Sequence, residues 1–208
     1  ILLILVDVII FLSGERTSFA ILLIINFGFI ILISQMKYIR IVTFIISMIL
    51  IGIISISNNK VKDRMIDQTI KDIGLKNYQI HLFSNIHQDH YETAYKIFKD
   101  NVLLGAGPKM FRYECSKKEF QSGEYSCTTH PHHLHLQILS ETGILGYLFV
   151  LGTFFWVTKI FITTIYFNYF KKKFIENSDL QNCILIGVFV NLFPFLPSGN
   201  FFNNWLSI

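Results

Sequence analysis

Long apolar stretches recur along this chain and limit how it can fold. The run 41–56 carries no charged residue, and a longer run at 134–170 carries only two. A helix that crosses the hydrocarbon core of a bilayer needs about 20 mainly apolar residues, and it satisfies its backbone polar groups internally. Overall, 52% of the residues are hydrophobic and only 15% are charged, which excludes an ordinary soluble domain. We therefore predict an all-α integral membrane protein, a helical bundle with several spans.

Most polar residues are concentrated in one central segment. Residues 57–133 hold six of the seven histidines, two of the three cysteines and most of the charged residues. We predict three parts: transmembrane spans in 1–56, a large loop or lid of mixed helix and coil in 57–133, and further spans in 134–208. Because the chain begins inside one apolar run and ends where another could start, we expect a fragment whose first and last spans are truncated.

Basic residues in the short loops predict the orientation. Lys37–Arg40 and Lys171–Lys173 carry positive charge next to apolar runs, so both loops should be cytoplasmic. The segment 57–133 then faces outward, together with Arg16 and the turn 197–200. The net charge of +4 is modest and scattered along the chain, which does not indicate nucleic-acid binding.

Two short motifs carry the chemistry. The stretch His130-Pro131-His132-His133-Leu134-His135 leads into the long apolar run, with Glu141 and Gly143 following it. Ionisable side chains at a membrane edge often mark a functional site. From the residues alone, three interpretations stay open: interfacial surface side chains, a metal site, or a general base. Upstream, Gly105-Ala106-Gly107-Pro108 predicts a tight bend, because glycine adopts backbone conformations closed to other residues.

Together these motifs resemble the O-antigen ligase and polymerase superfamily, integral membrane glycosyltransferases that use polyprenyl-diphosphate-linked glycans. The family pattern is G-x-G-x-x-x-F, then a His usually followed by Asn, then L-x-x-L-x-E-x-G entering a transmembrane helix. His133 stands where Asn is usual, and His135 where an aromatic residue is common. The residues that match the pattern are Gly105, Gly107, Phe111, His132, Leu136, Leu139, Glu141 and Gly143.

The resemblance implies roles for three of these residues. His132 would be the general base, or would orient the acceptor hydroxyl, because a sugar hydroxyl attacks poorly until its proton is taken. Glu141 would orient the histidine or cap the start of the helix. Arg16 looks like the arginine that neutralises the leaving diphosphate, a task that suits a planar guanidinium. Its alternative role is a snorkelling anchor paired with Glu15.

A second arginine usually precedes the glycine turn in this family, but the matching segment 87–90 has none. His90 could replace it, and the other candidates are Arg112, Arg64 and Lys109. The diphosphate-binding set predicted from the sequence is therefore Arg16, His90, Arg112 and Lys109.

Two cysteines bracket a polar loop just before the histidines. Cys115 and Cys127 lie in the segment predicted to face an oxidising compartment, so we predict a disulfide between them. Cys183 lies in an apolar run and is expected to be a buried thiol.

The resemblance implies a metal-independent O-antigen ligase-like enzyme in the bacterial inner membrane, with a periplasmic active face and no cofactor. Its partners would be a polyprenyl-diphosphate-linked glycan donor, lipid A-core or another glycan as acceptor, and membrane lipids. Two alternatives stay open: a polysaccharide polymerase of the same superfamily, and a non-catalytic transporter or export partner.

Overall fold

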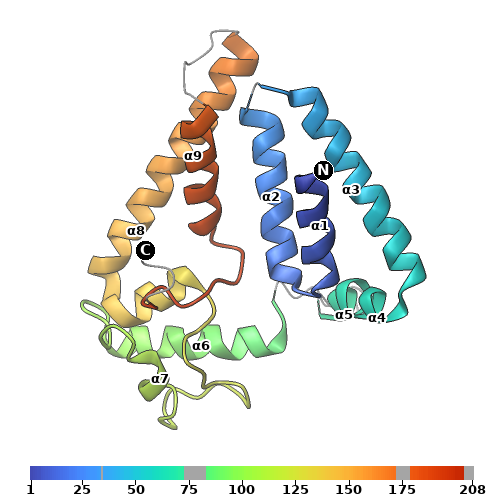
Figure 1. Ribbon diagram of the computed structural model, residues 1–208. Coiled ribbons are helices and arrows are strands. Elements are labelled where there is room, and N and C mark those ends of the chain that lie inside the picture. The colour runs from blue at the N-terminus through green and yellow to red at the C-terminus, as the bar shows by residue number, and fades with distance from the viewer. Residues whose placement is uncertain (34, 73–82, 172–178, 204–208) are drawn as a thin grey trace. The chain divides into compact units, whose positions relative to one another are not determined.

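The computed structural model describes residues 1–33, 35–72, 83–171 and 179–203 (Figure 1). Lys172 and Lys173 of the predicted cytoplasmic loop lie outside these ranges. Within them all regular elements are helical, which confirms the predicted all-α class. The helices are α1 (Leu2–Leu12), α2 (Arg16–Leu32), α3 (Lys37–Ser57), α4 (Asn59–Lys62), α5 (Gln68–Asp72), α6 (Asn85–Asp100), α7 (Phe111–Glu114), α8 (Leu134–Tyr166) and α9 (Asp179–Asn191).

Two helices of the described chain, α3 and α8, are long and apolar enough to cross a membrane. They coincide with the apolar runs predicted to span. Helices α1, α2 and α9 are apolar but shorter. The number of spans therefore remains a prediction, while the helical membrane character is supported by α3 and α8.

The chain divides into two compact units. The first comprises Ile1–Ile80 and Val157–Asn191, and the second comprises His81–Trp156 and Leu192–Ile208. Because α8 begins in the second unit and ends in the first, its residues contribute to both.

Apolar clusters hold the first unit together. Phe11, Ile51 and Met65 form one cluster, and a second cluster joins α2 to α9. Some of the buried polar groups of this unit pair with one another, which lowers the cost of excluding water from them. The Asn26 amide donates to the Asp7 carboxylate across 2.9 Å, which ties α2 to α1.

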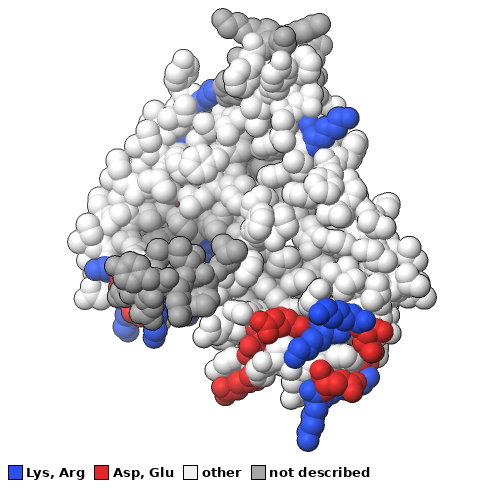
Figure 2. Space-filling model, turned by 180° about the vertical axis from the view of Figure 1, so that it is seen from behind, with Lys and Arg blue, Asp and Glu red and all other residues white. Residues whose placement is uncertain are grey.

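In the second unit, α6 packs on α7 and on the start of α8. The core side chains are Ala94, Ile97, Phe111, Cys115 and Phe120. Tyr95 of α6 is 47% exposed, so it lies outside the buried face of the helix. Charged side chains gather at the end that carries α6 and α7, while most of the face in view is uncharged (Figure 2).

Helix α8 is interrupted at Gly143, whose φ of 65° and ψ of −167° are not helical. The interruption separates a first part, 134–142, from the membrane-length part, 144–166. It opens a gap in the helix hydrogen bonding that the glycine turn fills.

Candidate active site

The two sequence motifs interlock through their backbones. Ala106 N donates to Ser140 O and Gly107 N donates to Glu141 O, each across 2.9 Å. On the other side of the break, Ile144 N donates to Val102 O across 2.8 Å. The break at Gly143 would otherwise leave helix carbonyls and amides unpaired, at a cost of about 1–3 kcal/mol for each buried group. The glycine turn therefore completes the hydrogen bonding of the broken helix.

Glycine is required on both sides of this contact. Gly105 and Gly143 have φ of 68° and 65°, a region that L side chains rarely adopt. A Cβ on Gly105 would overlap the backbone of Glu141 and Thr142, and one on Gly143 would lie 2.6 Å from Gly105 N. At Gly107, glycine is required by the backbone conformation, with φ of 109°. An added Cβ would lie 3.2 Å from Met110 Cγ and would not overlap the backbone of a neighbour.

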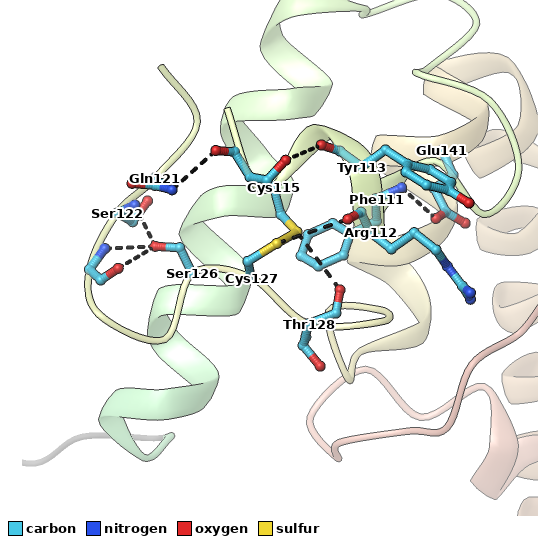
Figure 3. Close-up of a disulfide and its surroundings, with 12 residues drawn as sticks. Phe111, Arg112, Tyr113, Cys115, Gln121, Ser122, Ser126, Cys127, Thr128 and Glu141 are labelled. Atoms are coloured by element: carbon cyan, nitrogen blue, oxygen red, sulfur yellow. Dashed lines mark hydrogen bonds between the residues drawn. A yellow bond between two sulfur atoms is a disulfide. The ribbon is translucent and has the colours of Figure 1, made fainter. Parts of the chain in front are cut away.

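Glu141 joins the same two motifs through its side chain. The carboxylate is fully buried and accepts a hydrogen bond of 3.0 Å from Phe111 N, the first residue of α7 (Figure 3). Its other oxygen accepts from Gln137 Nε2 across 3.2 Å. The hydrogen bonds described for this carboxylate thus go to the end of the glycine turn and to its own helix.

Gln137, one helical turn earlier, fixes the segment that follows α9. It is also fully buried, and its amide donates to Asn200 Oδ1 across 2.8 Å. Its carbonyl oxygen accepts from Phe201 N across 3.0 Å. A further bond of 2.8 Å runs between His135 Nε2 and Leu192 O. The start of α8 therefore lies between the glycine turn and the segment 192–203.

His133 caps α8 and is not free to react. Its Nε2 lies 2.9 Å from Pro194 O, and its Nδ1 lies 3.3 Å from Leu136 N. A carbonyl only accepts and a backbone amide only donates, so the ring must be neutral with its proton on Nε2. Burial is the main reason that the pKa of His133 falls from 6.5 to about 4.

His132 lies at the centre of a second group of imidazoles. Its ring centroid is 4.0 Å from that of His130, 5.5 Å from that of His90 and 6.0 Å from that of His87. The backbone of His132 adopts a φ of 55°, and its carbonyl accepts from Ser198 N across 2.9 Å. Side chains from α6 and from the loop before α8 thus meet at this ring, and the segment after α9 holds the backbone of His132.

Three of these imidazoles, those of His90, His130 and His132, are neutral at pH 7. Burial, followed by repulsion from His132, lowers the pKa of both His90 and His130 to about 4. Burial also lowers the pKa of His132 itself. His132 therefore has a basic ring nitrogen at neutral pH, as a proton acceptor requires. His90 is neutral at pH 7 and so supplies no positive charge of its own. A bound anion would raise the pKa of His90 and favour its protonated form.

Two buried polar atoms of α6 lack partners in the described structure. They are His90 Nδ1 and Tyr91 Oη. Such atoms are rare in native proteins and often point to a missing ligand or water. No group of three or more His, Cys, Asp or Glu side chains is arranged to hold a metal ion within the ranges the structure describes.

The predicted disulfide is present. Cys115 and Cys127 are bonded, with their Cα atoms 4.9 Å apart (Figure 3). Cys115 is fully buried in the core cluster beside Phe111. The bond therefore holds the loop before His130 against the same core that the glycine turn packs on.

Polar contacts also hold the disulfide loop on α6. The Asp89 carboxylate accepts from Tyr125 N across 3.1 Å, and Lys96 Nζ donates to Gln121 O across 2.6 Å. At Gly123, an added Cβ would overlap the Asp89 carboxylate. This loop is thus attached to the helix that supplies His87 and His90.

Two of the predicted diphosphate-binding cations belong to this unit. Arg112 follows Phe111 and is exposed, and its charge contributes to the low pKa of His130. Its guanidinium extends away from the disulfide (Figure 3). Lys109 is exposed and has a φ of 64° in the glycine turn. Arg112 is therefore a permanent cation that interacts electrostatically with His130, one of the imidazoles around His132.

The remaining candidate cations, Arg16 and Arg64, belong to the first unit. Arg16 Nη1 pairs with the Asp72 carboxylate across 2.7 Å. Glu15 instead pairs with Arg64 across 3.6 Å, so the alternative pairing of Arg16 with Glu15 is wrong. Arg64 also donates to Gly14 O across 3.0 Å.

Sequence reasoning missed three parts of this site. His87 was not singled out, although His87, His90 and Tyr91 recur at the i, i+3, i+4 spacing that places side chains on one helix face. Gln137 and the packing of the segment 192–203 also went unnoticed, because the hydrogen bonds between them join residues more than 60 positions apart.

Comparison with known families identifies the chain. The family model described as O-antigen ligase matches residues 1–151. Comparisons with curated proteins and with solved structures give no match. The matched range includes the glycine turn, the histidine stretch and the broken start of α8, so the chain belongs to the O-antigen ligase family, membrane-integral proteins of the ligase and polymerase type that transfer glycans.

Proposed function

We propose that this protein transfers a glycan from a polyprenyl-diphosphate carrier to an acceptor hydroxyl, in the manner of an O-antigen ligase with lipid A-core as acceptor. The observation that carries the proposal is the neutral His132 ring, which lies on the family motif and among the rings of His130, His90 and His87. The reaction would take place at the periplasmic face of the inner membrane, where the carrier's sugars meet water.

His132 acts as the general base. The acceptor hydroxyl attacks the anomeric carbon of the donor sugar, and its proton passes to the His132 ring. The bond from the anomeric carbon to the diphosphate oxygen breaks, and the carrier diphosphate leaves with the electron pair. Proton transfer of this kind typically contributes about 10²–10⁴ in rate. The strained backbone at His132, held through its carbonyl by Ser198, fixes the direction of the ring.

Cationic side chains bind the diphosphate. Arg112 is the best candidate to replace the second arginine that the family usually carries. It is exposed, it is permanently charged, and its charge lowers the pKa of His130. Lys109 in the glycine turn adds a second charge. His90 joins them only when the bound anion favours its protonated form. We keep Arg16 as the other diphosphate ligand on the strength of the family resemblance.

The reaction needs no metal ion in this proposal. A diphosphate is a good leaving group once its charge is neutralised, and guanidinium groups do this through paired hydrogen bonds. Glu141 and the two glycines of the turn act as positioning residues, because their contacts hold the turn that carries Lys109 and leads to Arg112.

Complementation tests the proposal. The full-length protein is expressed in a strain that lacks its O-antigen ligase, and the lipid A-core fraction is examined for attached glycan. We expect transfer by the wild type, a loss of about 10²–10⁴-fold in His132→Ala on the general-base scale, and near-normal transfer in His135→Ala. Arg16→Lys should also be impaired, since a point charge cannot replace a bidentate guanidinium.

The products separate the remaining alternatives. Glycan that stays on the carrier but grows longer would assign the protein to polymerisation instead. Wild-type transfer by His132→Ala, with loss in His130→Ala, would move the base to the neighbouring ring. No glycan product in any form, with the protein inserted and folded, would refute the enzymatic proposal.

A further inference from the structure

Three consecutive exposed apolar side chains precede the glycine turn. Val102, Leu103 and Leu104 are 46%, 66% and 73% exposed. These residues follow the charged C-terminal end of α6 in sequence, and the segment around them is otherwise polar. Side chains of this kind in water are costly, by roughly 25 cal/mol for each Å² of apolar surface. Three adjacent exposed apolar side chains therefore indicate a surface that contacts another molecule.

This apolar tip is fixed to the membrane-length part of α8. Val102 O accepts from Ile144 N across 2.8 Å, and Leu103 O accepts from Leu145 N across 3.4 Å. A Cβ on Gly143 would overlap the Leu103 carbonyl group, so the two backbones are in direct contact. The tip therefore lies at the depth of the first turn of the membrane-length helix and cannot move away from it.

The exposed surface continues along α8. Leu145, Leu148 and Phe149 are 59%, 54% and 79% exposed. Helix α8 is one of the two described helices able to cross a membrane, so this surface suits contact with acyl chains. The tip and the helix form one apolar surface within a single compact unit.

The end of α6 has the composition of a membrane interface. Tyr95 is 47% exposed, and Lys99 Nζ lies 4.5 Å above the centre of its ring. Tyrosines gather at the level of lipid headgroups, and lysines near that level extend their ammonium groups to the phosphates. Lys99 and Lys109, both exposed, lie before and after the tip in sequence.

We propose that residues 102–104 insert into the acyl-chain region of the leaflet beside the histidine site and so set the depth of the glycine turn. The occupant is bilayer lipid, because the patch continues a membrane-spanning surface and is flanked by Tyr95 and the two lysines. This inference does not depend on the proposed glycan transfer, since it concerns only where the tip lies.

Fluorescence quenching tests the insertion. The full-length protein with Cys183→Ala is reconstituted, without reducing agent, into phosphatidylethanolamine and phosphatidylglycerol bilayers. Leu103→Cys and Leu104→Cys are each labelled with an environment-sensitive fluorophore. Lys118→Cys, in the exposed disulfide loop, is the matched control. The Cys183→Ala parent should take no label, because Cys115 and Cys127 are bonded.

We expect labels at 103 and 104 to emit at shorter wavelength than the label at 118. Nitroxide-bearing lipids should quench them, and aqueous iodide should quench them several-fold less than the control. Equal iodide quenching at 103, 104 and 118 would place the tip in water and overturn the proposal. Protection from both iodide and lipid nitroxides would show that protein covers the tip, which overturns it equally.

Discussion

Removing the Glu141 carboxylate should destabilise the site more than it disturbs the chemistry. Glu141→Ala leaves the buried Phe111 N–H without its acceptor, at a cost of about 1–3 kcal/mol. Gln137 keeps its bond to Asn200 but loses the one to Glu141, a further cost of about 1 kcal/mol. The expected loss in the free energy of unfolding is therefore about 2–4 kcal/mol.

Glu141→Gln separates a positioning role from a catalytic one. The glutamine carbonyl can still accept from Phe111 N, while its NH₂ group faces the Gln137 amide and loses that bond. We expect a loss of about 1 kcal/mol and substantial retained glycan transfer. A carboxylate that acted on His132 through its charge would be lost in this variant, so transfer would fall as far as in Glu141→Ala.

Thermal unfolding of the purified full-length protein, followed by tryptophan fluorescence, measures the stability. At roughly 2–4 °C per kcal/mol, Tm should fall by about 5–15 °C in Glu141→Ala and by only a few degrees in Glu141→Gln. Glu119→Ala, on an exposed part of the disulfide loop, is the control and should change little. An unchanged Tm in Glu141→Ala would refute the anchoring role. Wild-type Tm with abolished transfer in Glu141→Gln would show that the carboxylate acts in the reaction.

Three further predictions concern the surroundings of the site. His133→Asn should retain transfer, because Asn can cap α8 in place of Nδ1, and should lose about 1 kcal/mol with the bond to Pro194; inactivity at normal stability would contradict this. Alkylation of the non-reduced protein should modify Cys183 alone, and Cys115→Ala/Cys127→Ala should cost about 3 kcal/mol by loop entropy; labelling of all three thiols would refute the bond. The pKa of His133 in the folded protein lies below its value in the unfolded chain. The neutral ring therefore contributes fully to the free energy of unfolding above pH 6.5, and this contribution declines by on the order of 3 kcal/mol as the pH falls toward 4. Chemical denaturation across that range should show the decline, and His133→Asn should reduce it; a flat profile in the wild type would exclude the effect.

Helix positions could be predicted from the sequence because apolar length determines them. The runs that became α3 and α8 are long and almost uncharged, and no competing arrangement satisfies their backbone in lipid. The boundaries of α6 could not be predicted, because Asn85–Gln88 carries no apolar periodicity and the helix is held by contacts of His90 and Tyr91 with distant segments.

The site could be predicted only in part, because its contacts are remote in sequence. His132 and the two glycines were found through their spacing, and the disulfide through the compartment expected for its loop. The contacts of Gln137 with Asn200 and of His133 with Pro194 join residues about 60 positions apart, and no local pattern encodes them. Glu141 had two possible roles in the sequence, and its hydrogen bonds add a third, as the link between the glycine turn and α8.

The charge state of the histidine group bears on how the proposed reaction is driven. Burial opposes a proton on His132, His90 and His130, and repulsion from His132 opposes it further on His90 and His130. The site therefore disfavours the imidazolium that a general base becomes. In the proposed reaction that cation forms as negative charge develops on the leaving diphosphate. The attraction between the two charges is greatest in the transition state, where binding energy raises the rate rather than only the affinity. Replacing Arg112 should therefore weaken donor binding, whereas replacing His132 should lower the rate at saturating donor, and steady-state kinetics on the two variants would distinguish these effects.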